Sequence, residues 1–312
     1  MRDPYGRDVY DLRIQVTGRC NQNCIYCHSE GYSSGCARES FRDLLSMEDI
    51  RSIVEAASEL GIRRVKITGG EPLLRRDLVD VVWSISSIDS IEDISMTTNA
   101  TLFSDKNVEG LYEAGLKRVN VSLDSLRKEV YERITQSKNF EAAVSGLIKC
   151  TDTFSLVKIN MVLLKSLNDG EILDMLDFAR NHGAILQLIE LVNANRGEDV
   201  FGEFSVDMDE VEWGLREKAV GYYCREMQGR PKYYFKDGGV MEVVRPMHNS
   251  VFCAKCPRIR LTWDGKLKPC LLTNDVVDVS TALKKGASKS ELKMLLEACI
   301  AARKPFFSLT VV

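Results

Sequence analysis

The sequence has no long apolar run, no excess of basic charge and no apolar leader at its start. The missing apolar run excludes a membrane-spanning helix, which needs roughly 18 or more such residues. The formal net charge is −3, so no overall basic field points to nucleic acid or an anionic membrane as a partner. Because residues 1–8 are also too polar for a secretory signal peptide, we expect a cytoplasmic protein without nucleic-acid or membrane partners.

Cysteine is the residue type that stands out, with ten copies in 312 residues. In a reducing cytosol, metal binding or catalysis explains them better than a disulfide framework. Six of them form two tight groups of three, Cys20, Cys24 and Cys27, then Cys253, Cys256 and Cys270. The other four are Cys36, Cys150, Cys224 and Cys299. Of these, Cys150 and Cys299 lie on apolar helix faces and are expected to be buried.

Apolar runs rich in Val and Ile alternate with helical patterns through the first 195 residues. Strands are expected at 12–17, 62–68, 91–98, 117–123, 156–163 and 185–192. Helices are expected at 47–61, 76–87, 105–114, 128–134, 140–150 and 171–182. Six β/α units whose strands are nearly continuously apolar predict a parallel sheet covered by helices. An open doubly wound sheet and a partial barrel both fit this pattern.

The alternation stops after about residue 195. Residues 196–205 are expected to be a linker, followed by a short helix, further strands and a helix at 289–303. We therefore divide the chain into a core, 1–195, and a C-terminal region, 196–312. Polar residues cluster where predicted core strands end, at 68–71, 97–99 and 122–124, and both architectures place their active sites at such ends.

The first cysteine group directly follows the first predicted strand. Three thiolates within eight residues can hold one small metal site, and three ligands for a four-iron cluster leave one iron open. Zinc is the structural alternative, with His28 as a fourth ligand.

The pattern CxxxCxYC, in which Tyr26 precedes the last cysteine, resembles the signature of the radical S-adenosylmethionine (SAM) superfamily. The segment Gly69-Gly70-Glu71-Pro72, after the second predicted strand, resembles the GGEP motif of the same superfamily. This resemblance implies a [4Fe–4S] cluster whose free iron binds SAM, with the motif receiving the methionine amino group. The residue types suit that role, because glycine lets a backbone approach a ligand closely and a carboxylate suits an ammonium group.

The second cysteine group again has three members and not four. A zinc site could borrow Cys299 or His248, whereas an open three-cysteine cluster would offer an iron to the substrate. Arg258 and Arg260 follow Cys256 and point the same way if the segment is extended. We expect them to face an anion or a base beside the cluster.

Together with segments 11–17, 73–75, 97–99 and 120–124, these motifs resemble the GTP 3′,8-cyclase family of molybdenum-cofactor biosynthesis over residues 5–306. The resemblance implies a lyase that converts GTP to (8S)-3′,8-cyclo-7,8-dihydroguanosine 5′-triphosphate with SAM and two [4Fe–4S] clusters. It also implies an α/β fold, a partial (β/α)6 TIM-like barrel with a C-terminal cluster-binding extension. The implied partners are GTP, a reductant for the cluster and a downstream cyclic pyranopterin monophosphate synthase, and a homodimer is left open.

The same resemblance assigns contacts to individual residues. Those matching SAM contacts are Tyr26, Gly70, Glu71, Ser122 and Val192. Those matching GTP contacts are Arg13, Lys66, Thr98, Lys158, Arg258 and Arg260. A triphosphate needs several cations that converge from different strands, and Arg13, Lys66 and Lys158 each lie on or near a predicted strand.

The sequence departs from the family pattern at three places. Lys66 replaces a common Arg, which keeps the charge but loses bidentate binding. Val192 replaces a common Met and is expected to be a weak SAM contact. Many members end in Gly-Gly, a tail proposed to enter the active site, whereas this sequence ends in Val311-Val312. Either the tail is dispensable here or the substrate step differs.

Two other functions fit parts of the sequence. One is a two-cluster radical SAM enzyme that modifies a peptide or a tetrapyrrole. The enzymes with peptide substrates usually carry more cysteines in this region than the four found after residue 250. The other is a zinc-stabilised α/β binding protein without redox chemistry.

Overall fold

A computed structural model describes residues 1–28 and 44–306. Cys36 and the last six residues, with the expectations attached to them, lie outside the described residues. A twelve-stranded sheet forms the centre of the fold, in the order β12-β11-β10-β1-β2-β3-β4-β5-β6-β9-β8-β7. No helix in the described ranges is long and apolar enough to cross a membrane.

The six predicted β/α units are present in the first part of the chain. Their strands are β1 Asp11–Gln15, β2 Arg64–Thr68, β3 Asp93–Thr98, β4 Arg118–Ser122, β5 Val157–Val162 and β6 Ile185–Ile189. Their helices are α1 Met47–Glu59, α2 Leu78–Ser86, α3 Asp105–Glu113, α4 Lys128–Thr135, α5 Phe140–Thr153 and α6 Ile172–Asn181. The first helix shows why local sequence predicted them well. Ser46 and Asp49 form a capping box at its start, and Gly61 follows its end with φ +100°.

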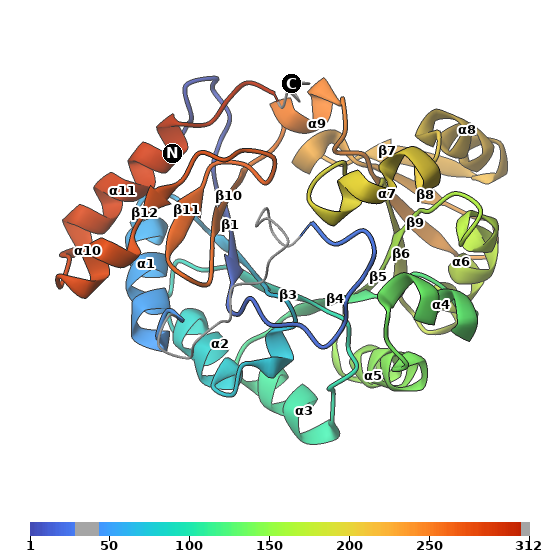
Figure 1. The fold of residues 1–312 in the computed structure, drawn as a ribbon, viewed down its shortest axis with the longest axis horizontal. Coiled ribbons are helices and arrows are strands. Elements are labelled where there is room, and N and C mark those ends of the chain that lie inside the picture. The colour runs from blue at the N-terminus through green and yellow to red at the C-terminus, as the bar shows by residue number, and fades with distance from the viewer. Residues whose placement is uncertain (29–43, 307–312) are drawn as a thin grey trace.

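The strand order decides between the two predicted architectures. Strands β1 to β6 are neighbours in sequence order and pair in parallel. Because crossovers between parallel strands are right-handed, an order without reversal places all the connecting helices on one face. Figure 1 shows these helices on the outer side of a curved sheet. The fold is therefore a partial TIM-like barrel.

The core strands alternate between buried apolar and cavity-facing polar residues, so the expectation of nearly continuous apolar strands was wrong. In β1, Leu12 and Ile14 are buried in the core, whereas Arg13 faces an internal cavity. In β2, Val65 is a core residue and Lys66 faces the same cavity. One face of the sheet thus packs on helices, and the other presents polar groups to the barrel interior.

The expected linker at 196–205 is a helix, α7 Arg196–Phe204. Its acidic and glycine residues suggested a solvated connection, but Phe204 anchors it in a small apolar cluster with Leu164 and Leu191. Packing of this side chain outweighs the weak local propensity.

The C-terminal region continues the sheet at both ends. At one end are α8 Met208–Lys218, β7 Gly221–Cys224, β8 Pro231–Tyr234 and β9 Val240–Val244. At the other are α9 Ser250–Ala254, β10 Arg258–Leu261, β11 Lys266–Lys268, β12 Val277–Asp278, α10 Ser280–Lys284 and α11 Lys289–Ala301. Strand β9 pairs in parallel with β6, and β10 pairs in parallel with β1. Strands β7 and β12 end the sheet and do not pair with each other in the described ranges, so the barrel is not closed.

Candidate active site

One cavity of about 760 Å³ lies inside the curved sheet. Both cysteine groups line it, namely Cys20, Cys24, Cys27, Cys253, Cys256 and Cys270. The other candidate residues line it too: Arg13, Tyr26, Lys66, Gly70, Glu71, Thr98, Ser122, Lys158, Val192, Arg258 and Arg260. The structure therefore brings all the predicted site residues together, while their roles stay predictions.

The loop with the first cysteine group is tied to the end of β2. Gly70 N donates to Thr17 O at 2.8 Å, and Glu71 N donates to Arg19 O at 2.7 Å. A Cβ atom at Gly70 would lie 2.0 Å from Arg19 O, so no side chain fits at this position. The close approach that this glycine allows here is that of the cysteine-loop backbone, and its contact with SAM stays a prediction.

The other end of this loop is held by an aspartate that the sequence did not single out. Tyr26 Oη donates to Asp124 Oδ2 at 2.7 Å, and Val162 N donates to the other carboxylate oxygen at 2.9 Å. Burial raises the pKa of Asp124 to about 6. Its place at the end of β4, beside Ser122, was the available signal. Asp124 thus fixes the orientation of the Tyr26 ring at the cavity wall.

Glu71 accepts three hydrogen bonds in this structure, which leaves its carboxylate one of about four acceptor positions. It accepts from Thr98 Oγ1 at 2.6 Å, from Asn99 N at 2.7 Å and from Leu73 N at 3.1 Å. Burial raises its pKa to about 7. The contact of Thr98 with GTP stays a prediction. In this structure its hydroxyl group donates to Glu71 and accepts from Ala100 N at 3.0 Å. Within the described structure, Thr98 positions this carboxylate.

Two arginines hold the backbone of the second cysteine group. Cys253 lies in α9, Cys256 follows that helix and Cys270 follows β11. Arg7 Nη1 donates to Cys253 O at 3.0 Å, and Arg303 Nη2 donates to Cys256 O at 2.5 Å.

Both of these guanidinium groups are paired with the same buried acid. Arg7 and Arg303 approach Asp3 to 2.5 and 3.2 Å. No motif pointed to this arrangement, because its members come from the two ends of the chain.

The residues proposed to complete a zinc site differ in where they lie. Cys299 is fully buried in α11, as expected for a small apolar residue, and neither it nor His248 lines the cavity. His28 does line it. Among residues 1–28 and 44–306, no three His, Cys, Asp or Glu side chains are close enough to hold a single metal ion.

The cavity is strongly basic although the chain is not. Among the described residues, twelve Lys and Arg side chains line it against four Asp and Glu. The cations are Arg7, Arg13, Arg64, Lys66, Arg118, Lys158, Arg225, Arg230, Arg258, Arg260, Arg303 and Lys304. With a net charge of −3 on the whole chain, this concentration indicates a site for an anion.

Three of these cations form a row across neighbouring strands. Arg260, Arg13 and Lys66 are register partners on β10, β1 and β2. Burial and the guanidinium groups of Arg13, Arg258 and Arg118 hold the pKa of Lys66 well below its usual range. The row therefore crowds positive charge in a way that an anionic ligand would relieve.

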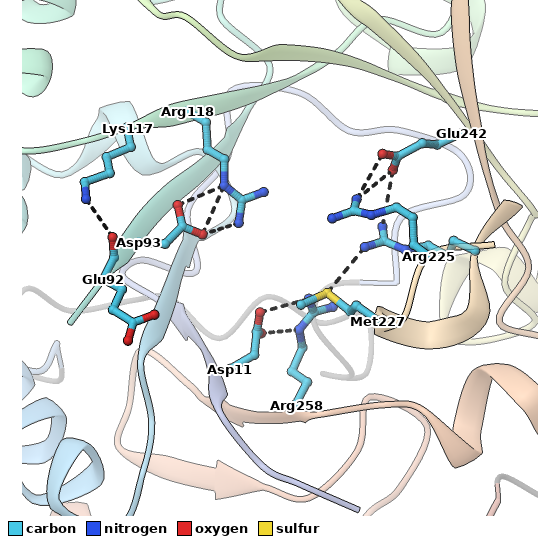
Figure 2. Close-up of polar contacts among 10 residues, drawn as sticks. Asp11, Glu92, Asp93, Lys117, Arg118, Arg225, Met227, Glu242 and Arg258 are labelled. Atoms are coloured by element: carbon cyan, nitrogen blue, oxygen red, sulfur yellow. Dashed lines mark hydrogen bonds and ion pairs between the residues drawn. The ribbon is translucent and has the colours of Figure 1, made fainter. Parts of the chain in front are cut away.

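On β1 beside this row, Asp11 pairs with Arg258 at 2.5 Å. Figure 2 shows this pair with Arg118 and Arg225 around the open interior of the barrel. Arg118 is paired with Asp93. The prediction that Arg258 and Arg260 face the same side is confirmed, because both line the cavity.

Lys158 belongs to a second cationic group, centred on Glu242. Lys158 Nζ lies 2.5 Å and Arg225 Nη1 2.9 Å from Glu242 Oε1. Burial alone would raise the pKa of Glu242, but Lys158, Arg230 and Arg225 lower it to about 2. Burial also lowers the pKa of Lys158 to about 7 despite the opposing effect of Glu242. The sequence signal for Glu242 was an acid inside the apolar strand β9, and it was missed.

Comparison with known families matches nearly the whole chain. The Radical SAM superfamily matches residues 14–179, and the family Molybdenum Cofactor Synthesis C matches residues 184–309. A protein of Methanothermobacter thermautotrophicus named "Probable GTP 3′,8-cyclase" is 44% identical, and the match covers 99% of each chain. A Thermococcus kodakarensis protein of the same name is 43% identical, over 98% of this chain and 99% of its own.

Solved structures agree on the fold. SuiB of Streptococcus suis, bound to S-adenosylmethionine, superposes with a TM-score of 0.63 at 15% identity, covering 92% of this chain and 68% of that one. HydG, a maturase of the [FeFe]-hydrogenase, superposes with a TM-score of 0.53 at 17% identity, covering 68% of this chain and 49% of that one. By its sequence relatives and its fold, the chain belongs to the radical SAM superfamily and, within it, to the GTP 3′,8-cyclase family.

Proposed function

We propose that this protein is a radical SAM lyase that converts GTP to (8S)-3′,8-cyclo-7,8-dihydroguanosine 5′-triphosphate in molybdenum-cofactor biosynthesis. The observation that carries the proposal is the shared cavity, where two groups of three cysteines and an excess of cations face the same space. A nucleoside triphosphate fits that combination, because its phosphates need several charge-assisted contacts from different strands. The names of the full-length relatives support GTP as the substrate.

Membership of the radical SAM superfamily implies SAM and one [4Fe–4S] cluster. The residues present fit that cluster, because three thiol groups line the cavity and Gly70 leaves room for the loop that carries them. We assign it to Cys20, Cys24 and Cys27, and a second cluster to Cys253, Cys256 and Cys270. When bound, the first cluster and SAM supply the radical that removes a hydrogen atom from the substrate.

The remaining steps depend on how side chains hold the two small molecules. We assign the methionine amino group of SAM to Glu71, which Thr98 and the backbone of Asn99 hold in one orientation. Tyr26, fixed by Asp124, and Ser122 and Val192 would line the rest of the SAM site.

For GTP, we assign the row Arg260, Arg13 and Lys66, with Arg258 and Lys158, to the nucleotide. The position of bound GTP matters more than the affinity for it, because an error of ~1 Å at the reacting atom can cost ~100-fold in rate. The reaction also requires an external one-electron reductant. We expect the product to pass to a cyclic pyranopterin monophosphate synthase, and a homodimer remains part of the proposal.

The test is turnover with a choice of substrates. Enzyme reconstituted anaerobically with iron and sulfide is incubated with SAM, a reductant and each of the four ribonucleoside triphosphates. We expect 5′-deoxyadenosine and a cyclised nucleotide with GTP, and no cyclised product with the other three. Cleavage of SAM that no nucleotide stimulates would refute the substrate assignment while leaving the radical SAM chemistry in place.

A further inference from the structure

We propose that Arg225 and Arg230 bind the phosphate groups of the nucleotide, with Glu242 as the counter-ion that offsets part of their charge before the nucleotide arrives. With Lys158 they would form a second phosphate-binding wall. This inference rests on the proposed function. It extends that function to the β-hairpin of β7 and β8, which carries none of the recognised motifs.

The two arginines lie at opposite ends of the turn between β7 and β8. Arg225 N donates to Arg230 O at 2.8 Å, which closes the turn and brings the two residues together. Both side chains line the cavity, as do Met227 and Gln228 from within the turn. Because β8 pairs with β9, which follows β6 in the sheet, the hairpin is fixed to the barrel and presents its arginines to the interior.

Arg230 is a largely buried cation with poor partners. Its side chain is only 12% exposed, and within the described residues its Nε atom has no hydrogen-bond partner. Its Nη1 atom lies 3.9 Å from Glu242 Oε2, beyond hydrogen-bond distance. Its Nη2 atom donates to Met227 Sδ at 3.4 Å, and a thioether is a weak acceptor. Buried guanidinium groups are normally paired, so Arg230 has donors to spare for a ligand in the cavity.

The charges around Glu242 do not balance. Lys158, Arg225 and Arg230 share this one carboxylate. The remaining contact of the carboxylate is with Gln187, whose Nε2 atom donates to Oε2 at 3.0 Å and brings no charge. When Lys158 is protonated, two positive charges are left over in a largely buried place, which is costly without an anion. Figure 2 shows Arg225 beside Glu242, on another side of the interior from Arg258.

Phosphate is the anion that suits this place best. A guanidinium group binds two phosphate oxygens at once, and the two arginines could engage neighbouring phosphates. Guanine is neutral and would leave the excess charge uncompensated. The phosphate chain would thus lie between the Glu242 group and the row Arg260, Arg13 and Lys66.

Binding of nucleotides with different numbers of phosphates tests this inference. Reconstituted enzyme without reductant is titrated anaerobically with GTP, guanosine and inorganic tripolyphosphate by calorimetry. Relative to wild type, Arg230→Gln and Arg225→Gln should each weaken GTP and tripolyphosphate by roughly ten- to a hundred-fold, with guanosine unchanged. Arg216→Gln is the matched control, because this arginine lies on neighbouring α8, is half exposed and does not line the cavity.

The outcomes separate this inference from the proposed function. Unchanged GTP affinity in both arginine variants, or equal losses for GTP and guanosine, would overturn the inference alone. A wild-type protein that binds no GTP would overturn both. If either variant folds poorly, as judged by its SAM affinity, Glu242→Gln gives a test of opposite sign. Removing the competing carboxylate should tighten tripolyphosphate binding, and unchanged or weaker binding would count against the proposal.

Discussion

Arg13 on β1 lies directly beside Arg260 on β10, as its register partner across two parallel strands. Like charges in neighbouring strands repel each other, so this pairing concentrates positive charge on one part of the cavity wall. An anion bound by both side chains would offset this repulsion. The pairing also links the first strand of the core to the segment that carries the second cysteine group.

Arg260→Lys tests whether the Arg13–Arg260 pair aligns the nucleotide or only attracts it. The change keeps the charge and removes the planar fork, so we expect GTP affinity to fall by less than about ten-fold. Formation of the cyclised nucleotide should fall by about a hundred-fold, because the reacting hydrogen is displaced. The measurement compares the Kd for GTP with the yields of 5′-deoxyadenosine and product. A variant that cyclises GTP at the wild-type rate would contradict the assignment.

The cysteine groups can be separated by their iron content. Cys24→Ala and Cys256→Ala should each lose about half of the bound iron after reconstitution, because each removes one ligand of a different cluster. Only Cys24→Ala should abolish SAM cleavage as well. Cys224→Ala is the control, since this exposed cysteine lies on β7 and does not line the cavity. A colourless wild-type protein that retains zinc would exclude both cluster assignments.

Thr98→Val distinguishes between two roles for this threonine. Its hydroxyl donates to Glu71, so its loss should disturb the carboxylate assigned to SAM. A hydrogen bond to a charged group is worth about 1.5–3 kcal/mol, which predicts SAM binding weaker by roughly ten-fold or more. GTP binding should change by less than about three-fold. If GTP affinity falls more than SAM affinity, the direct GTP contact expected from the family resemblance would be correct.

The affinity for GTP should fall as the pH rises above about 7. Burial lowers the pKa of Lys158 to about 7 in the free protein, whereas bound phosphate would favour the charged ammonium. The complex then holds more protons than the free protein between about pH 7 and the normal lysine pKa of about 10.4, so binding takes up a proton and weakens at higher pH.

Calorimetry at pH 8 in buffers of different ionisation enthalpy measures this proton uptake. The groups facing Lys158 are Glu242, Arg225 and Arg230. The pKa of Glu242 is lowered to about 2 and that of Arg230 to about 10, so neither of these two groups titrates near pH 8. Lys158→Arg should remove the proton uptake while retaining GTP binding. Equal uptake in that variant would assign the proton to another group.

Local sequence predicted the β/α units well, because capping residues and apolar periodicity are encoded within each helix. It predicted the inner face of the barrel poorly. Arg13 and Lys66 each interrupt an apolar strand, and that alternation was the signal that one face lines a polar cavity. The motifs correctly identified the residues that converge on the cavity, because Cys20 and Gly70 belong to patterns that can be recognised without a structure.

The remaining site residues depend on contacts between distant segments. Asp124 accepts a hydrogen bond from Tyr26, 98 residues away in the sequence. Glu242 accepts one from Arg225 because β9 joins the sheet beside β6. No local sequence pattern predicts these long-range contacts. The helix at 196–204 was missed for a related reason, since Phe204 stabilises it through packing and not through propensity.

The pairing of β10 with β1 also sets the order in which the barrel can be completed during synthesis. Strand β1 is made first, yet its neighbour on one side ends only at Leu261. Until that residue has left the ribosome, one edge of the nascent barrel keeps unpaired backbone groups. A chain that stops before β10 would carry this open edge permanently, and we infer that such fragments self-associate.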